Sequence, residues 1–249
     1  MLYDELNYPN IALHDIDGVQ IPFSNNWKKI GINVSGGADS ACLTMLLANL
    51  IIKNKYNCEI HIISYVRGWM TKPWQSYTSK QVFNKLKDMF PSIIKTRHEY
   101  FMSVELEYGA TFSNACSTAG QDFSNYIAFH EGLDAMFNAT SSNPPFYIDG
   151  QIDSRTIDKS TIDMSELIYL DTYKDLKVFR CCPLVCTSKD WIVKQYYNNN
   201  AIDLLNITRS CEGEFDNLDF TNYIQGQYVP LCNKCFWCKE RKWATDLNA

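Results

Sequence analysis

One short stretch joins two glycines to hydroxyl and carboxylate side chains, in the order Ser35, Gly36, Gly37, Ala38, Asp39, Ser40. It follows a strand-like run at residues 29–34 and leads into an apolar, helix-like run at residues 41–52. Glycines let backbone N–H groups approach an anion closely, and the start of a helix adds partial positive charge. A strand, a tight glycine turn and a helix start therefore predict a phosphate-binding loop.

The side chains of this loop indicate how it would bind a nucleotide. Ser35 and Ser40 offer hydroxyl donors to phosphate oxygens. Asp39 would repel a bare phosphate, so we expect it to hold a Mg²⁺ ion that accompanies the phosphates. A glycine turn with a helix cap is the simpler interpretation. The full strand–turn–helix context favours a nucleotide site, with Asp39 and Ser40 in catalytic positions.

A second group of residues fits the binding of a metal, with the spacing C-x20-C-x2-C-x2-C: Cys211, Cys232, Cys235, Cys238. Four thiolates at such spacing satisfy a tetrahedral Zn²⁺, and gaps of two residues are typical of structural zinc turns. An iron–sulfur cluster also takes four cysteines and stays an alternative. A disulfide framework is not expected, because we find no secretory signal and infer a reducing compartment.

Composition indicates a protein of ordinary globular type. The 249 residues fit one α/β domain with a small appendage, and 46% of them are hydrophobic. A net charge of −5 argues against nucleic acid as a partner, because binding along phosphates needs a basic surface. No apolar run approaches the ~18–20 residues of a membrane span. We therefore expect a cytoplasmic protein without a membrane partner.

The chain alternates strand-like and helix-like runs. The expected strands lie at residues 29–34, 59–66, 94–102 and 134–140, and the expected helices at residues 41–52, 76–89 and 121–132. This alternation predicts an α/β fold with a parallel, doubly wound, Rossmann-like sheet, whose ligands bind at the carboxyl ends of the strands. The polar stretch at residues 103–120 reads as a loop. The expected parts are an N-terminal extension (1–28), an ATP-binding α/β domain (29–206) and a zinc-binding segment (207–249).

The glycine loop has no Lys after its second glycine and is therefore not a Walker motif. It resembles the PP-loop of the ATP pyrophosphatase superfamily instead. That resemblance implies cleavage of ATP between the α and β phosphates, transfer of AMP to an oxygen of the substrate, and a loop that holds the departing pyrophosphate. It implies a reaction class without naming a substrate.

The last third of the chain resembles one family of that superfamily more closely. Pro183-Leu184 with Lys189, then Thr208-Arg-Ser-Cys211, the cysteine cluster and Arg241 are similar to segments of the 7-cyano-7-deazaguanine synthase family. The resemblance runs over residues 29–243. The chain departs from the family in a longer gap between the first two cysteines, with an insertion at residues 212–231.

This resemblance implies an ATP-dependent ligase that converts a 7-carboxy-7-deazaguanine-like acid and ammonia into a nitrile through an adenylate. Its implied cofactors are ATP, Mg²⁺ and Zn²⁺, and a homodimer is a possible assembly. Lys189 would contact phosphate, although a solvent-exposed helix residue is the simpler interpretation. Arg67, directly after a strand, is a weaker nucleotide-binding candidate, and Asp149 could contact the exocyclic amine of a purine-like base.

Other functions compete with nitrile synthesis. A PP-loop enzyme that transfers sulfur to tRNA would need a reactive cysteine pair or an iron–sulfur cluster, and further cysteines are available: Cys116, Cys181, Cys182, Cys186. A reductase of adenylylated sulfate would not use four cysteines on a metal turn. A non-catalytic ATP-binding module is disfavoured by the intact Ser35, Asp39 and Ser40. His61 is expected in the core, and no role follows for the other histidines.

Overall fold

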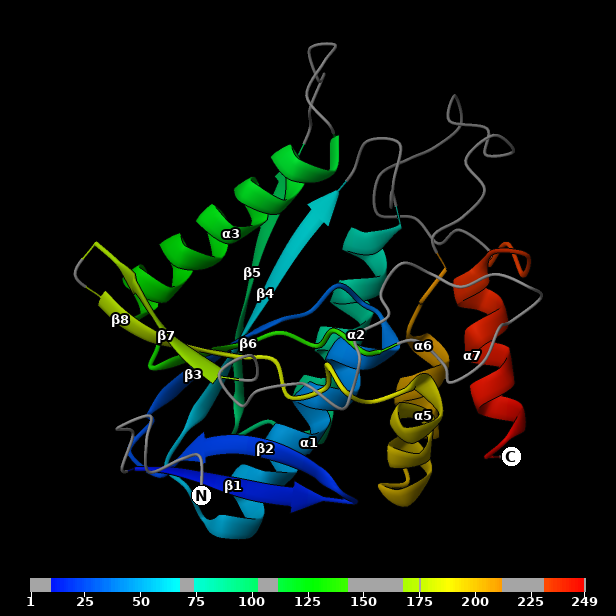
Figure 1. The fold of residues 1–249 in the computed structure, drawn as a ribbon, viewed down its shortest axis with the longest axis horizontal. Helices are drawn as coiled ribbons and strands as arrows, with labels where there is room; N and C mark the ends of the chain where they lie inside the picture. The colour runs from blue at the N-terminus through cyan, green and yellow to red at the C-terminus, as the bar shows by residue number, and fades with distance from the viewer. Residues whose placement is uncertain are drawn as a thin grey trace.

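The computed structural model describes residues 10–67, 74–102, 112–142, 168–174, 176–211 and 231–248. Its centre is a six-stranded sheet of order β5-β4-β3-β6-β8-β7 (Figure 1). The strands are β3 (Lys29–Asn33), β4 (Glu59–Arg67), β5 (Ile94–Met102), β6 (Ala135–Phe137), β7 (Ile168–Tyr173) and β8 (Leu176–Cys181). The pairs β3–β4, β4–β5, β3–β6 and β6–β8 are parallel, which confirms the expected sheet.

One edge of the sheet differs from the expectation. β7 pairs with β8 in the antiparallel direction, with Tyr173 opposite Leu176 across a short connection. A tight hairpin can only join antiparallel strands, whereas a parallel pair needs a long crossover. The sheet is therefore parallel with one antiparallel edge strand.

The strand order creates a switch point in the sheet. β3 is central: β4 and β5 lie to one side of it, and β6 and β8 lie to the other. The connections that leave the carboxyl ends of β3 and β6 therefore diverge to opposite sides. In open α/β sheets the crevice at such a point is where ligands bind. The predicted phosphate loop follows β3 directly.

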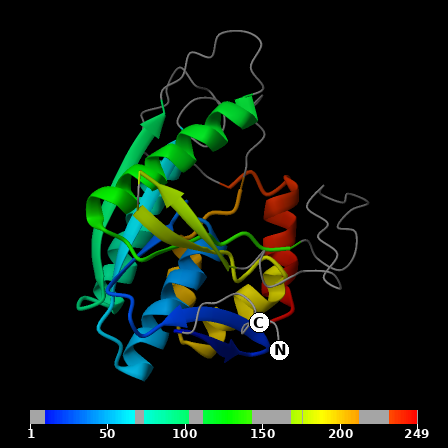
Figure 2. The ribbon, with the colours of Figure 1, turned by 60° about the vertical axis from the view of Figure 1, so that its left-hand side comes forward.

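Helices cover both faces of this sheet (Figures 1 and 2). α3 (Phe112–Glu131) lies on one face, over a small core that includes Ile63, Ile127 and Met136. The larger core lies on the other face, beneath the remaining helices: α1 (Ala38–Asn54), α2 (Gln75–Met89), α5 (Lys189–Asn198), α6 (Ile202–Ile207), α7 (Phe236–Asp246). The expected α/β class is thus confirmed as three layers, with the sheet in the middle.

The described part of the N-terminal region is a hairpin of β1 (Ile11–Ile16) and β2 (Val19–Ser24). Asp17 and Gly18 form its two-residue turn with positive φ angles of 47° and 83°, as a type I′ turn requires. Ile21 and Phe23 are fully buried in the larger core. The hairpin therefore packs as part of the α/β body.

The expected loop at residues 103–120 is wrong in its second half, because α3 already begins at Phe112. The polar composition of this stretch and Gly120 concealed the helix. A side chain at position 120 would bring Cβ within 3.1 Å of the Tyr65 ring, so glycine lets α3 pack closely against β4. Tertiary contact thus compensates for the low helix propensity of glycine.

Candidate nucleotide site and cysteine cluster

The predicted phosphate loop forms a tight turn between β3 and α1. Gly36 has a φ of +84°, and a Cβ there would lie 2.8 Å from the backbone nitrogen of Ser79. Only glycine fits this position, since both the backbone angle and the space exclude a side chain. The backbone carbonyl of Gly36 accepts a 2.8 Å hydrogen bond from the N–H of Arg209, which fixes the turn.

α1 starts directly after this turn. Gly37 is its N-cap in an extended conformation, and the Gly37 N–H is 3.4 Å from the Ser35 hydroxyl oxygen. Ser40 donates its hydroxyl to the Gly37 carbonyl at 3.2 Å, and Tyr196 donates to the Ala38 carbonyl at 2.6 Å. The first N–H groups of a helix have no partner within it. The loop therefore presents backbone donors and two hydroxyls at the positive end of a 17-residue helix.

Asp39 and Lys189 are 150 residues apart in the sequence and form an ion pair at the start of α1. Lys189 begins α5 and is 3% exposed, so this ammonium group is not the solvated helix residue of the simpler interpretation. Ser141, in the segment after β6, donates to the second oxygen of Asp39 at 2.8 Å. Glu240 of α7, also fully buried, lies 4.0 Å from the Lys189 ammonium. The structure thus brings together a cation and two carboxylates beside the loop.

A cavity of about 320 Å³, here called the loop cavity, opens in front of these groups. It is lined by residues from the loop, from the segment after β6, and from α5 and the C-terminal region: Ser35, Gly37, Ala38, Asp39, Ser40, Ala139, Thr140, Lys189, Arg209, Ser210, Trp237. Its walls combine helix N–H groups, hydroxyls and cationic side chains. That chemistry suits a phosphorylated ligand with a bound metal ion.

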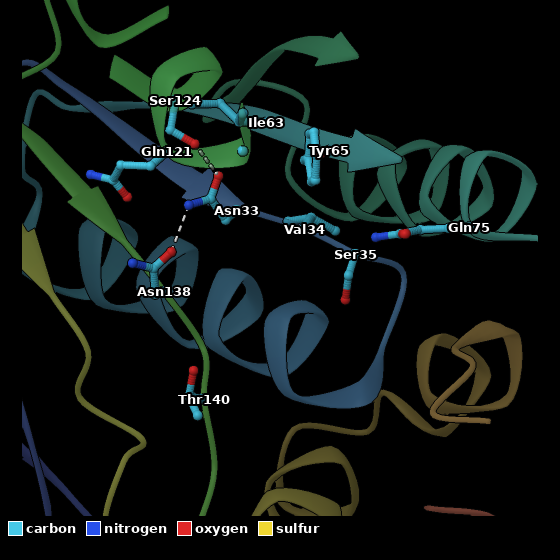
Figure 3. Close-up of a pocket in the computed structure, with 11 residues that line it drawn as sticks. Asn33, Val34, Ser35, Ile63, Tyr65, Gln75, Gln121, Ser124, Asn138 and Thr140 are labelled. Carbon is cyan, nitrogen blue, oxygen red and sulfur yellow. Dashed lines mark hydrogen bonds between the residues drawn. The ribbon is translucent and has the colours of Figure 1, made fainter. Parts of the chain in front are cut away.

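A second cavity of about 450 Å³, here called the switch cavity, lies at the carboxyl ends of β3, β4 and β6. Ser35 and Thr140 line both cavities, so the two adjoin. Asn33 donates to Asn138 at 2.5 Å and accepts from Ser124 at 3.1 Å (Figure 3). Amide and hydroxyl groups therefore dominate its wall. They suit a neutral, hydrogen-bonding ring more than a charged group.

Some predicted residues can be placed only in part. Arg67 is the last residue of β4, at the same edge of the sheet as the loop, and the structure describes its backbone alone. Asp149 and all but the last residue of the insertion at residues 212–231 lie outside the described residues. The nucleotide role of Arg67 and the base contact of Asp149 stay predictions.

The four predicted metal-binding cysteines converge in space. Cys211 lies beyond α6, Cys232 and Cys235 lie directly before α7, and Cys238 lies in the first turn of α7. The sulfur of Cys232 is 3.4 Å from that of Cys211 and 3.8 Å from that of Cys238. Four ligands at ~2.3 Å around one tetrahedral ion are separated by ~3.8 Å. An iron–sulfur cluster places its cysteines on separate irons and spreads their sulfurs further apart.

The four cysteine thiols also need a bound cation in order to lose their protons. Hydrogen bonding to Cys211 raises the pKa of the Cys238 thiol well above its usual range, and hydrogen bonding to Cys235 raises the pKa of Cys211. Several thiolates cannot form side by side unless a positive ion balances them. The donor set and its spacing therefore fit a single thiophilic metal ion.

Arg241, three residues beyond the last cysteine, has a structural contact in this fold. Its guanidinium donates to the backbone carbonyls of Thr208 at 2.5 Å and Leu205 at 2.6 Å, at the end of α6. Burial lowers the pKa of Arg241 below its usual value. A cation at the carboxyl end of a helix satisfies carbonyls that have no helical partner. Arg241 thereby ties α7 to α6 beside the loop.

Several residues of the site were assigned no role from the sequence: Asn33, Arg209, Ser210, Glu240. Asn33 carried a signal, because it is a polar residue near the carboxyl end of an apolar strand. Arg209 lies with its guanidinium carbon 4.1 Å above the Trp74 ring, a cation–π contact that no sequence pattern indicates. Ser141 and Glu240 reach the site only through the tertiary fold.

In the described part of the chain, no helix has the length and apolar character needed to cross a membrane.

No protein-family model and no curated protein sequence matches this chain. Among solved structures, it is similar to the U34-tRNA thiolase NcsA from Methanococcus maripaludis with its 4Fe-4S cluster, at 15% identity and a TM-score of 0.45. It is also similar to the Candida glabrata FMN adenylyltransferase in complex with FMN and an ATP analogue, at 12% identity and a TM-score of 0.36. The alignments cover 88% and 67% of this chain, but only 64% and 46% of the solved chains.

Proposed function

We propose that this chain is an ATP-dependent enzyme of the PP-loop type that releases AMP and pyrophosphate. The observation that carries the proposal is the position of the glycine loop. It follows β3 at the switch point of the sheet, and it faces a cavity that contains the Asp39–Lys189 ion pair. A phosphate-binding loop, a buried cation and a carboxylate are the parts that phosphoryl and nucleotidyl transfer need.

Different residues of the site would bind the leaving group and the metal ion. The loop amides with Ser35 and Ser40 bind the pyrophosphate, and Lys189 neutralises the charge that develops as the bond between the α and β phosphates breaks. Asp39 orients Lys189 through one oxygen and accepts from Ser141 through the other. Its remaining lone pairs would hold Mg²⁺ together with the phosphates. Arg67 is proposed as a further contact to the nucleotide.

The proposed acceptor is a carboxylate on a 7-deazaguanine-like ring, bound in the switch cavity. Its oxygen attacks the α-phosphorus, pyrophosphate leaves, and an acyl adenylate forms. Ammonia then displaces AMP to give an amide. The amide oxygen attacks the α-phosphorus of a second ATP, pyrophosphate leaves, and loss of AMP and protons gives the nitrile. Asn33 and Asn138 supply amide donors and acceptors of the kind that the polar edge of such a ring requires. The protein positions reactants without a nucleophile of its own.

A direct assay tests this proposal. The purified chain is incubated with Mg²⁺-ATP, ammonium and 7-carboxy-7-deazaguanine, and nucleotides and base are separated by chromatography. We expect AMP, pyrophosphate and the nitrile, with no turnover when ammonium or the acid is omitted. ADP with inorganic phosphate would contradict the PP-loop assignment. If AMP forms only with a different acid, the PP-loop assignment stands and the proposed acceptor is wrong.

Sulfur transfer to tRNA is the second candidate, because one cysteine lies beside the cavities. Burial raises the pKa of Cys182, while hydrogen bonds with Thr140, which lines both cavities, lower it in part. Sulfur transfer needs a thiolate, whereas nitrile formation needs none. We expect Cys182→Ser to keep ATP-dependent activity. Loss of activity by a folded Cys182→Ser protein would favour sulfur transfer.

A further inference from the structure

A second group of metal-ligating side chains lies away from the loop and the cysteines. It joins His61 of β4, His98 of β5 and Glu131 at the end of α3. His61 Nδ1 is 3.7 Å from one carboxylate oxygen of Glu131, and His98 Nε2 is 3.5 Å from the other. All the donor atoms lie within 4.8 Å of one another. The sequence placed His61 in the core, which its 3% exposure confirms, but gave no hint that His98 would join it.

The two imidazoles are turned toward a common point. The Thr96 hydroxyl oxygen lies 2.8 Å from His61 Nδ1 and 3.0 Å from His98 Nε2. On the other side of the His61 ring, Nε2 lies 3.1 Å from a carboxylate oxygen of Glu59. A carboxylate accepts only, so the neutral imidazole donates from Nε2 and keeps its lone pair on Nδ1. That lone pair faces Thr96, His98 and Glu131.

This arrangement contains the ligands of a metal site and a carboxylate that orients one of them. Two imidazole nitrogens and a carboxylate are the donors that zinc-type ions prefer, with ligand distances of about 2.0–2.2 Å. Donors at that distance from one ion are separated by roughly 3.3–3.6 Å in a tetrahedron, close to the two separations between histidine nitrogens and Glu131 oxygens. The Glu59 contact supplies the carboxylate partner that commonly orients a ligating histidine.

We propose that His61, His98 and Glu131 bind one divalent ion of the zinc type, with a fourth position left for water. The site lies away from the ATP chemistry. His61 pairs with Gly31 in the register of β3, ahead of the phosphate loop, and Glu131 ends α3. The ion would therefore join the end of α3 to β4 and β5. α3 also carries Ser124, which lines the switch cavity, so the ion would fix the helix that forms one wall of that cavity.

Cobalt titration tests this proposal separately from the cysteine cluster. Co²⁺ is added to the purified full chain, and binding is followed by visible absorption and calorimetry. Cobalt bound by thiolates gives intense sulfur-to-metal charge-transfer bands, whereas nitrogen and oxygen ligands give only weak d–d bands. We expect the chain to bind one equivalent of Co²⁺ that gives weak d–d bands alone. A Cys235→Ser protein should still bind this equivalent. The measurement requires no enzymatic activity, so it stands apart from the proposed function.

Variants identify the ligands. We expect His98→Ala to weaken Co²⁺ binding by about 100-fold or more and Glu59→Gln, which leaves the ligands in place, by about 10- to 100-fold. His130→Ala is the matched control: His130 neighbours Glu131, but its ring packs at a tilt against Tyr126, and its removal should leave affinity unchanged. Circular dichroism checks that each variant folds. The proposal is overturned if the native chain binds no such equivalent, or if folded His98→Ala binds Co²⁺ as tightly as the native chain.

Discussion

Gly36 and Gly18 offer a matched pair of positions at the scale of single residues. Their φ angles are +84° and +83°, but a Cβ at Gly36 would meet the backbone of Ser79 at 2.8 Å, whereas nothing lies within 4 Å at Gly18. Gly18→Ala should therefore cost only the backbone penalty, about 1 kcal/mol of unfolding free energy. Gly36→Ala should cost at least about 2 kcal/mol more, because the loop itself must move. Urea denaturation of both variants measures the difference, and equal losses would contradict the loop geometry.

Asp39 is the residue on which the proposed chemistry depends most. Asp39→Asn keeps the size of the side chain and an acceptor for Ser141, but removes the negative charge that faces Lys189. We expect AMP formation to fall by about 100-fold or more. Stability should fall by only about 1–3 kcal/mol, because Glu240 still lies 4.0 Å from the Lys189 ammonium.

The control for this variant is another first-turn aspartate. Asp203 lies in the first turn of α6 with its side chain 84% exposed, and Asp203→Asn should leave AMP formation unchanged. Both proteins are assayed with saturating Mg²⁺-ATP after their thermal unfolding has been compared. Full activity in Asp39→Asn would remove Asp39 from the mechanism.

The sequence could predict those site residues that local pattern places. The loop from Ser35 to Ser40 is contiguous, so its turn and its helix start follow from residue types alone. Lys189 was found only through resemblance to a family. Ser141 could be placed directly after the expected strand at residues 134–140, at the end of the sheet where ligands bind. Its contact with Asp39 could not be predicted, because that contact exists only after β6 has paired beside β3.

At the scale of elements, apolar periodicity predicted the strands β3, β4 and β5 and the helices α1 and α2 closely. It predicted β6 with longer bounds and did not predict β8. It failed where tertiary packing overrode local preference. α3 begins nine residues before the expected start at residue 121, since Gly120 is used for close packing on Tyr65. β7 was not predicted, because buried and exposed residues do not alternate clearly along this edge strand. Its antiparallel direction depends on the turn to β8. Such choices depend on neighbours that the sequence does not bring together.

We expect the cysteine cluster to fix the start of α7, in addition to the contacts of Arg241 with α6. Cys235 is the N-cap residue of α7, and its N–H is 3.3 Å from the sulfur of Cys232. Cys235→Ser should remove the zinc, one ion per chain, and lower the unfolding free energy by more than about 4 kcal/mol. Lys234→Ala, an exposed neighbour in the same turn, is the control and should retain metal and stability. Metal analysis with an absorption spectrum decides, and iron in place of zinc would contradict the assignment.

The pH dependence of this metal site has a definite sign. Hydrogen bonding to Cys211 raises the pKa of Cys238, and binding requires the deprotonated thiolates. Metal affinity should therefore rise with pH, and the stability that the metal supplies should be lost as the pH falls. Thermal unfolding of the zinc-loaded protein at several pH values checks this. If the protein loses zinc at low pH and its thermal stability does not change, other contacts hold α7.

At the scale of the whole molecule, the loop cavity joins segments that are far apart in the chain. Its walls come from residues 35, 37–40, 139–140, 189, 209–210 and 237, which are spread over most of the described sequence. α5 packs against α1 and α7, so the Asp39–Lys189 pair also links the two main halves of the helical layer. A ligand in this cavity therefore contacts several elements at once. Its binding free energy should appear as stability of the entire fold.

Mg²⁺-ATP should accordingly stabilise the protein against heat. At 100 times its dissociation constant, a ligand that binds only the folded state adds about 2.7 kcal/mol. For a chain of this size, that raises Tm by about 5–10 °C. Mg²⁺-pyrophosphate should give a similar shift, because the loop and Lys189 bind the departing group, whereas AMP should give less. Lys189→Ala should lose the shift and Asp203→Asn should keep it. Equal shifts with AMP and with pyrophosphate would show that the loop cavity does not distinguish pyrophosphate, and the assignment of the loop would fail.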